Sequence, residues 1–232
     1  MDIVSVKDNY TVMNYQKDGR AILDQKIKEN KNIIIVGGTG LYIKALLYNY
    51  KFMPEEEKKT YEGITNEELK KRADEIYPQN EIHKNNRKRL ERFLSHYDVT
   101  GEIIKTTKEK DEALYEFTLI GLTAPREELY NHLNKRVEIM MCEGLCEEVK
   151  DLYHKKLTKA ENFIGYKEFT QYFKGEKNIM DCMEETKKNS RKYAKRQYTW
   201  FKNQFQNVKW FQVDYNHFNK TIKKVSDYLD TL

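Results

Sequence analysis

The hydrophobic positions of this chain change their spacing several times, and each change predicts a different element of secondary structure. Residues 32–36 end in a short, unbroken β-branched run, IIIV, that stops abruptly at Gly37 and Gly38. Such a run predicts a buried strand. From Leu41 to Tyr48 the apolar residues instead follow a helical period. This part of the chain therefore predicts a strand, a glycine turn and a helix in succession.

Helical spacing recurs further along, next to residues that begin or end helices. Thr65 and Glu68 form a capping-box pattern, which predicts the start of a helix that ends before Pro78. Pro125 suits the first turn of another helix, and Gly144 suits its end. In all, helices are predicted at 65–76, 86–97, 125–143, 145–153, 165–173, 180–203 and from 217 onward, and further strands at 115–123 and 208–213.

Strands that alternate with helices predict an α/β fold with a mainly parallel sheet. The stretch from 51 to 111 contains only helical patterns and, from 105 onward, a charged linker. We therefore expect residues 51–111 to form a helical insertion, and residues 1–50 and 112–232 to form the α/β core.

Composition narrows the class of protein. Hydrophobic residues make up 39% of the chain and charged residues 34%, which is enough apolar material for a core. No apolar run is long enough to span a membrane, and no leader with a cleavage site opens the chain. The cysteines Cys142, Cys146 and Cys182 form no CxxC pair, and no histidine lies at metal-ligand spacing. A disulfide framework and a structural zinc site are disfavoured, and a cytoplasmic location is predicted.

The net charge of +5 matters less than the way the charges are distributed. Residues 187–202 contain seven lysines and arginines and no acidic residue, and a second basic cluster occupies residues 83–92. Acidic residues gather elsewhere, at 55–57 and 143–151. Such segregation is typical of a surface that binds a polyanion. The alternative for either cluster is a solvated helix face.

Residues 188–202 would present two different faces if they are helical. Lys188, Lys192 and Lys195 would share one face with Arg191 beside them. Tyr193, Arg196 and Trp200 would share another, and an aromatic set beside a guanidinium could hold an extruded base. The alternative is that Tyr193 and Trp200 belong to the hydrophobic core.

The glycine turn is the first candidate for chemistry. Gly37, Gly38 and Gly40 would let the backbone approach an anionic ligand at the start of a helix, and the Thr39 hydroxyl would point to the same place. A plain tight turn is the alternative. The sequence contains no GxxxxGK[ST] motif, so the usual phosphate-binding loop is absent.

Five segments, in order, resemble the tRNA dimethylallyltransferase (IPP transferase) family. They are residues 34–47 (IIVGGTGLYIKALL), residues 82–89 (IHKNNRKR, with Lys84 in place of the family proline), residues 121–126 with 134–137 (GLTAPR and NKRV), residues 163–168 (FIGYKE), and residues 190–202 (SRKYAKRQYTWFK). The resemblance covers nearly the whole chain.

The resemblance implies the transfer of a dimethylallyl group from dimethylallyl diphosphate to the exocyclic amine of the adenosine next to the anticodon in tRNA. It also implies a P-loop NTPase-like parallel-sheet core with a helical insertion that grips the tRNA anticodon stem. Mg2+ is implied as a cofactor, although no ligand for it can be assigned. The expected partners are the tRNA anticodon stem-loop and dimethylallyl diphosphate, with no membrane, and the chain is expected to be a monomer.

The same resemblance assigns roles to individual residues. Thr39 is implied as catalytic. The donor diphosphate is implied to lie near Gly37, Gly38, Gly40 and Arg136, with Arg126 as a second arginine; a surface arginine is the alternative for Arg136. The implied tRNA-binding residues form three segments: Lys88, Arg89, Leu90, Glu91 and Arg92; Asn162, Phe163, Ile164, Gly165, Tyr166 and Lys167; and Lys195, Arg196, Gln197, Tyr198, Thr199, Trp200, Phe201 and Lys202.

The sequence also departs from the family pattern. Neither a P-loop of the GPTASGKT kind nor the SADS-x-Q-x-Y segment, with its aspartate general base, is found, and the first core strand is missing. Asp2 and Asp8 are poor substitutes for that base, and only Lys58 or Lys59 approximates the family arginine of the insertion. We expect tRNA binding, with turnover that needs the missing segment from another source. The alternative is a non-catalytic tRNA-binding remnant.

Overall fold

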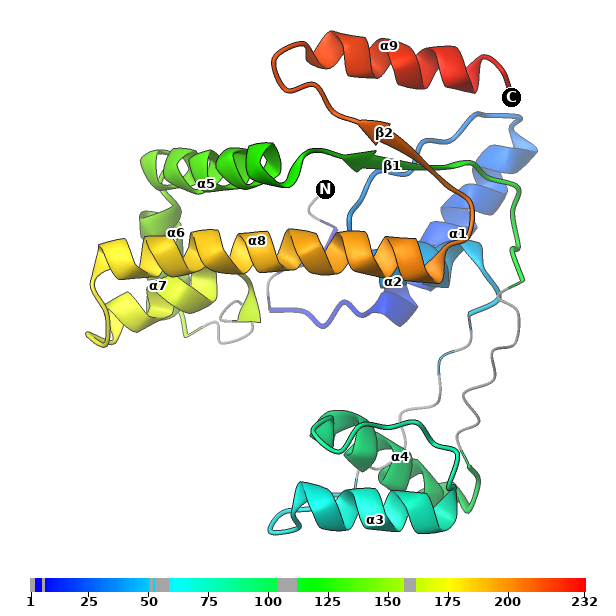
Figure 1. Ribbon diagram of the computed structural model, residues 1–232, viewed down its shortest axis with the longest axis vertical. Helices are drawn as coiled ribbons and strands as arrows, with labels where there is room; N and C mark the ends of the chain where they lie inside the picture. The colour runs from blue at the N-terminus through cyan, green and yellow to red at the C-terminus, as the bar shows by residue number, and fades with distance from the viewer. Residues whose placement is uncertain (1–2, 6, 51, 53–58, 104–111, 157–161) are drawn as a thin grey trace. The chain divides into compact units, whose positions relative to one another are not determined.

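The computed structural model describes residues 3–5, 7–50, 52, 59–103, 112–156 and 162–232 (Figure 1). The chain divides into two compact units. The first consists of Met1–Leu47 and Tyr115–Leu232, and the second of Tyr48–Leu114. The predicted insertion, 51–111, falls within the second unit. The charged linker from 105 to 111 lies outside the described residues, as do Asp2 and Lys58.

The first unit is mainly helical and contains a small parallel sheet. Strand β1 pairs in parallel with β2, with Leu119 opposite Val208 and Thr123 opposite Gln212. The predicted parallel pairing is confirmed for these two strands. The elements of this unit are α1 (Val12–Lys28), α2 (Gly40–Leu47), β1 (Leu119–Thr123), α5 (Arg126–Cys142), α6 (Leu145–His154), α7 (Tyr166–Phe173), α8 (Ile179–Gln204), β2 (Val208–Gln212) and α9 (Phe218–Leu229).

The prediction of a buried strand at residues 32–36 is wrong. The structure gives this segment no strand, and Ile34 and Val36 are 87% and 91% exposed. A strand needs a hydrogen-bonding neighbour, and within the described part of the chain the backbone of residues 32–36 has none. The described sheet therefore has two strands where three were predicted.

Helix α1 was not predicted from the sequence. Its first turn is capped by Thr11, which exchanges hydrogen bonds with Asn14, and Gly19 lies near its centre. A Cβ atom at Gly19 would lie 2.8 Å from the Cδ1 atom of buried Leu46, so the glycine lets α1 pack closely on α2. Arg20 donates from α1 to the carbonyls of Ala45 and Leu46, which satisfies the C-terminal end of α2.

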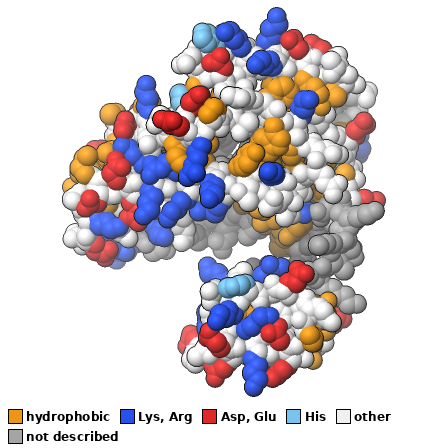
Figure 2. Space-filling view, in the orientation of Figure 1, with side chains coloured by type: hydrophobic (Ala, Val, Ile, Leu, Met, Phe, Trp, Pro, Cys, Tyr) orange, Lys and Arg blue, Asp and Glu red, His pale blue; other side chains and the backbone are white. Residues whose placement is uncertain are grey.

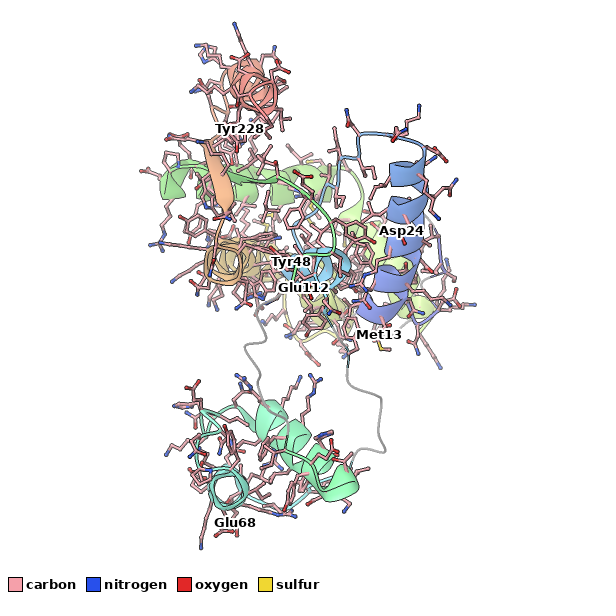
Figure 3. The ribbon with its side chains drawn as sticks, turned by 90° about the vertical axis from the view of Figure 1, so that its right-hand side faces the viewer. Met13, Asp24, Tyr48, Glu68, Glu112 and Tyr228 are labelled. Atoms are coloured by element: carbon pink, nitrogen blue, oxygen red, sulfur yellow. The ribbon has the colours of Figure 1, made fainter. Side chains whose placement is uncertain are left out.

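Helix α9 packs against strand β2 of the small sheet. The Tyr228 ring of α9 lies 5.7 Å from the Phe211 ring of β2, and the Lys209 ammonium lies 5.1 Å from the centre of the same tyrosine (Figure 3). At the other end of the unit, α6, α7 and α8 enclose a core cluster of Leu145, Val149, Phe169 and Cys182.

The first turn of helix α7 contains a buried carboxylate. Glu168 is 2% exposed and accepts hydrogen bonds from the Gly165 amide at 2.8 Å and from the Asn189 side chain of α8 at 2.6 Å. Gly165 has a φ of 97°, a conformation that favours glycine. Glu168 therefore ties the turn before α7 to the long helix α8.

We expect Glu168→Ala to lower the free energy of unfolding by about 2–4 kcal/mol, because it leaves the buried Gly165 amide and the half-buried Asn189 side chain without their acceptor. Urea denaturation measures this change. The matched control is Glu176→Ala, which removes an exposed carboxylate and is expected to stay within about 0.5 kcal/mol of the unaltered chain. Equal stability of the two variants would contradict the structural role of Glu168.

The second unit is built on two helices, α3 (Asn66–Ile76) and α4 (Arg87–Thr100). The predicted capping box is confirmed: Glu68 lies in the first turn of α3 (Figure 3) and exchanges hydrogen bonds with Thr65. Gly101 ends α4 in a left-handed conformation. No named strand occurs in the described part of this unit, whose core consists of Tyr61, Leu69, Ala73, Ile82, Leu90, Phe93 and Leu94.

None of the helices in the described ranges is both long enough and apolar enough to cross a membrane.

Candidate functional site

The glycine turn packs directly against α8. The Gln197 side chain donates a 2.8 Å hydrogen bond to the Gly38 carbonyl. A Cβ atom at Gly40 would lie 2.0 Å from the Trp200 ring, so no larger residue fits there without displacing that ring. Thr39 is exposed between these two contacts, and its carbonyl accepts the amides of Tyr42 and Ile43 as α2 begins. The turn thus presents the candidate catalytic threonine beside α8.

We expect Gly40→Ala to lower the stability of the chain by about 1–3 kcal/mol and to change its tryptophan fluorescence, because the added methyl collides with the Trp200 ring. Gly37→Ala is the matched control, since nothing lies within 4 Å of a Cβ atom at Gly37. Thermal unfolding and fluorescence spectra of the two variants make the comparison. Identical melting of both variants would show that Trp200 does not pack on this turn.

The exposed side of α8 carries the predicted basic residues. Lys188, Lys192 and Lys195 are exposed and follow one stripe of the helix, and Figure 2 shows lysine and arginine side chains gathered over α8. Across the described ranges, none of these three lysines has a carboxylate within 4.0 Å. Their charge is therefore directed to solvent, as a polyanion-binding surface requires.

Lys187 does not belong to this surface, although it begins the acid-free stretch in the sequence. It is 7% exposed and forms ion pairs with Glu138 of α5 at 2.7 Å and with Glu184 at 2.8 Å. Hydrogen bonds to these two carboxylates raise the pKa of the Lys187 ammonium above its usual value. Lys187 joins α5 to α8 and is a structural residue.

The aromatic residues of α8 divide between surface and core. Tyr193 is 40% exposed, and the Arg196 guanidinium lies 5.7 Å from the centre of its ring. Trp200 is half-buried, with the rings of Phe201 and Phe205 within 5.7 Å and 5.6 Å. Tyr193 with Arg196 is thus available to a ligand, whereas most of Trp200 serves the packing under the glycine turn.

The rest of the predicted segment 195–202 follows the same division. Lys195, Arg196, Tyr198, Thr199 and Lys202 are exposed, and Gln197 and Phe201 are half-buried. The Tyr198 ring lies 4.9 Å from the ring of Trp210 in β2.

The predicted segment 162–167 lies just before and at the start of α7. Phe163 is 63% exposed, and Asn162 and Lys167 are exposed as well. Gly165 is buried and Ile164 is half-buried. The Tyr166 hydroxyl donates to Glu148 of α6 at 2.7 Å, and burial together with this bond raises its pKa to about 12. Asn162, Phe163 and Lys167 are therefore the residues of this segment whose side chains are open to solvent.

The predicted segment 88–92 lies on α4 in the second unit. Lys88, Arg89 and Arg92 are exposed. Leu90 is fully buried in the core of that unit, and Glu91 pairs with Arg87 at 2.7 Å. The side chain of Leu90 is therefore not available to RNA, and only the basic residues of the segment present charge to solvent.

The two arginines predicted to bind the donor diphosphate lie on different sides of α5. Arg126 and Arg136 are ten residues apart, which is about 15 Å along the helix and roughly 80° around it. Both are exposed. Arg126 lies over the Tyr130 ring, at 5.1 Å from its centre, and lines a hollow between α5 and α8. The helix does not bring the two guanidiniums together.

Comparison with known proteins gives the site its context. The family model described as IPP transferase matches residues 1–204. A tRNA dimethylallyltransferase from Enterococcus faecalis is 38% identical to this chain over 243 aligned positions, which cover 99% of this chain and 78% of that protein. The chain belongs to the IPP transferase family.

Solved structures agree with this family assignment. The crystal structure of a tRNA delta(2)-isopentenylpyrophosphate transferase from Staphylococcus epidermidis matches with a TM-score of 0.69 and 31% identity, over all of this chain and 80% of that one. A eukaryotic dimethylallyltransferase acting on tRNA shares the fold, with a TM-score of 0.81 at 22% identity over 65% of its chain. The mixed helical fold with a small parallel sheet is therefore that of tRNA isopentenyltransferases.

A magnesium site is not evident in this IPP transferase. Within the described residues, no group of three or more histidine, cysteine, aspartate or glutamate side chains is placed to hold a metal ion. The donor set therefore does not fit a protein-built Mg2+ site, and we assign no step to the ion.

Two residues that border the hollow beside Arg126 were not predicted from the sequence. The guanidiniums of Arg126 and Arg191 both lie near the Tyr130 ring, and the Asn134 side chain accepts a 2.5 Å hydrogen bond from Arg191. The only signal in the sequence is that Asn134 and Arg191 lie inside family-like motifs. The two side chains come into contact only because α5 packs on α8 in the fold.

Proposed function

We propose that this chain transfers a dimethylallyl group from dimethylallyl diphosphate to the exocyclic amine of the adenosine next to the anticodon in tRNA. In this reaction the amine nitrogen forms a bond to the allylic carbon, the bond from that carbon to the diphosphate oxygen breaks, and the amine loses a proton. The diphosphate leaves with its negative charge, which arginine donors stabilise well.

One observation carries the proposal. The glycine turn with Thr39 is fixed to α8 through Gln197 and Trp200, and the same helix presents Lys192, Lys195 and Arg196 to solvent. A single rigid helix thus links the candidate catalytic turn to the candidate RNA surface. A base held by RNA on α8 would be brought to the turn without a hinge, which suits a reaction on an extruded adenine.

Fewer residues can be assigned to binding the diphosphate of the dimethylallyl donor. The sequence contains no GxxxxGK[ST] loop, and Arg136 is the arginine that the family resemblance assigns to the diphosphate. We therefore propose that rapid turnover needs a phosphate-binding segment in addition to these 232 residues. The monomeric state, the Mg2+ cofactor and the cytoplasmic location remain predictions.

The test is the incorporation of labelled dimethylallyl groups into unmodified tRNA, in reactions supplemented with the phosphate-binding segment of a relative. We expect Thr39→Ala to lower the rate by about 100-fold, the effect of removing one preorganised donor. Thr118→Ala is the matched control, because Thr118 is an exposed threonine outside the site. Absence of label with every chain would refute the proposed transfer, and equal rates for both variants would refute the role of Thr39.

A further inference from the structure

A hollow of about 510 Å3 lies between α5 and α8. Its lining residues all carry a polar or charged group and come from both helices: Arg126, Glu127, Tyr130, Asn131, Asn134 and Arg191. Two arginines, two asparagines and a tyrosine supply many hydrogen-bond donors in one place.

The two guanidiniums of the hollow are held in position by shared contacts. Arg126 lies 5.1 Å and Arg191 lies 5.9 Å from the centre of the same Tyr130 ring. Arg191 also donates to the Asn134 side chain at 2.5 Å, which uses one of its five N–H groups and orients the rest. Both arginines are therefore held at the rim of one hollow, an arrangement that favours an anion there.

The charges around the hollow strengthen this conclusion. Among the residues that the structure describes, neither Arg126 nor Arg191 has a carboxylate within 4.0 Å, and Glu127 is the one acidic side chain in the lining. Arg191 is flanked on α8 by exposed Lys188 and Lys195, three and four residues away. The hollow is thus continuous with the basic stripe of α8.

We propose that this hollow is a phosphate-binding site in which Arg126 and Arg191 grip one phosphate group, with Tyr130 holding both guanidiniums in place. The phosphate has two possible sources, the backbone of a bound RNA and a free diphosphate. The RNA source rests on the proposed function. The free-diphosphate source does not, because it depends only on the geometry of the hollow.

The experiment titrates the whole chain with two probes, an anticodon stem-loop RNA and inorganic pyrophosphate. The Arg126→Gln/Arg191→Gln variant is expected to weaken binding of one probe by at least about 10-fold, the size of one charge-assisted contact. The control, Lys223→Gln/Lys224→Gln, loses the same charge from exposed positions on α9 and is expected to bind each probe within about 2-fold of the unaltered chain. Arg126→Lys/Arg191→Lys keeps the charge but loses the planar fork, and it carries the test if the Gln variant does not fold.

The outcomes separate the two sources. Loss of RNA binding alone assigns the hollow to the RNA backbone, and loss of pyrophosphate binding assigns it to a free diphosphate. Binding of both probes at the level of the α9 control would overturn the inference and leave the proposed function intact. If the unaltered chain binds no RNA, the proposed function fails, and the pyrophosphate titration alone decides the inference.

Discussion

Adding the phosphate-binding segment of a relative is expected to raise dimethylallyl transfer by this chain at least about 100-fold. The departing diphosphate develops negative charge, and each preorganised donor aimed at that charge contributes about 100- to 1000-fold to the rate. The 232 residues contain no GxxxxGK[ST] loop to provide such donors. Thr39 and Arg136 each supply a single side chain, so they cannot replace a whole loop of backbone amides.

The rate is measured as label incorporated into tRNA per unit time, with the segment fused to the chain or added separately. A segment whose loop lysine is replaced by alanine is the matched control and should restore much less activity. The prediction is contradicted if the chain alone already transfers at the supplemented rate.

The sequence predicted best those elements whose pattern and caps agree. Helix α3 lies between the capping residue Thr65 and Pro78, and its bounds followed from these signals and its apolar spacing. Helix α1 was missed because Asn14 replaces the usual Glu or Gln of a capping box and Gly19 weakens the helical pattern. Its stability comes instead from packing on α2, which a local pattern does not reveal.

The segment at residues 32–36 was predicted wrongly for a different reason. Its composition is that of a buried strand, but strand formation depends on a neighbour elsewhere in the chain, and the described residues supply none. The composition of a segment indicates its tendency to form a strand, whereas hydrogen bonding to a neighbouring strand decides whether the strand forms.

The candidate site was predicted in outline because much of it lies in one continuous helix. The sequence of residues 188–202 alone indicates both the basic stripe and the aromatic residues. What the sequence could not show is burial. Lys187 and Leu90 both lie within basic stretches of the sequence. Lys187 is nevertheless paired with two carboxylates, and Leu90 lies in a hydrophobic core. The α5–α8 hollow was equally hidden, since it forms from residues that are far apart in the sequence.

Replacing Lys195 and Arg196 by alanine is expected to weaken binding of the anticodon stem-loop and to reduce its dependence on salt. Both side chains are exposed on α8, and Arg196 also lies over the Tyr193 ring. Each lysine or arginine that contacts a phosphate releases counterions, and removing one lowers the steepness of log K against log salt by about 1. The double variant should therefore flatten the slope by about 1–2. The Lys223→Ala/Lys224→Ala variant on α9 loses equal charge and should keep the original slope.

The most direct test of the central claim, that α8 is the RNA-binding surface, is a salt titration of anticodon stem-loop binding by these three chains, followed by fluorescence anisotropy of labelled RNA. We predict tight binding by the unaltered chain that falls steeply between about 50 and 200 mM salt. We also predict a flatter and weaker curve for Lys195→Ala/Arg196→Ala alone. Binding that does not depend on salt, or superimposable curves for the α8 and α9 variants, would contradict the claim.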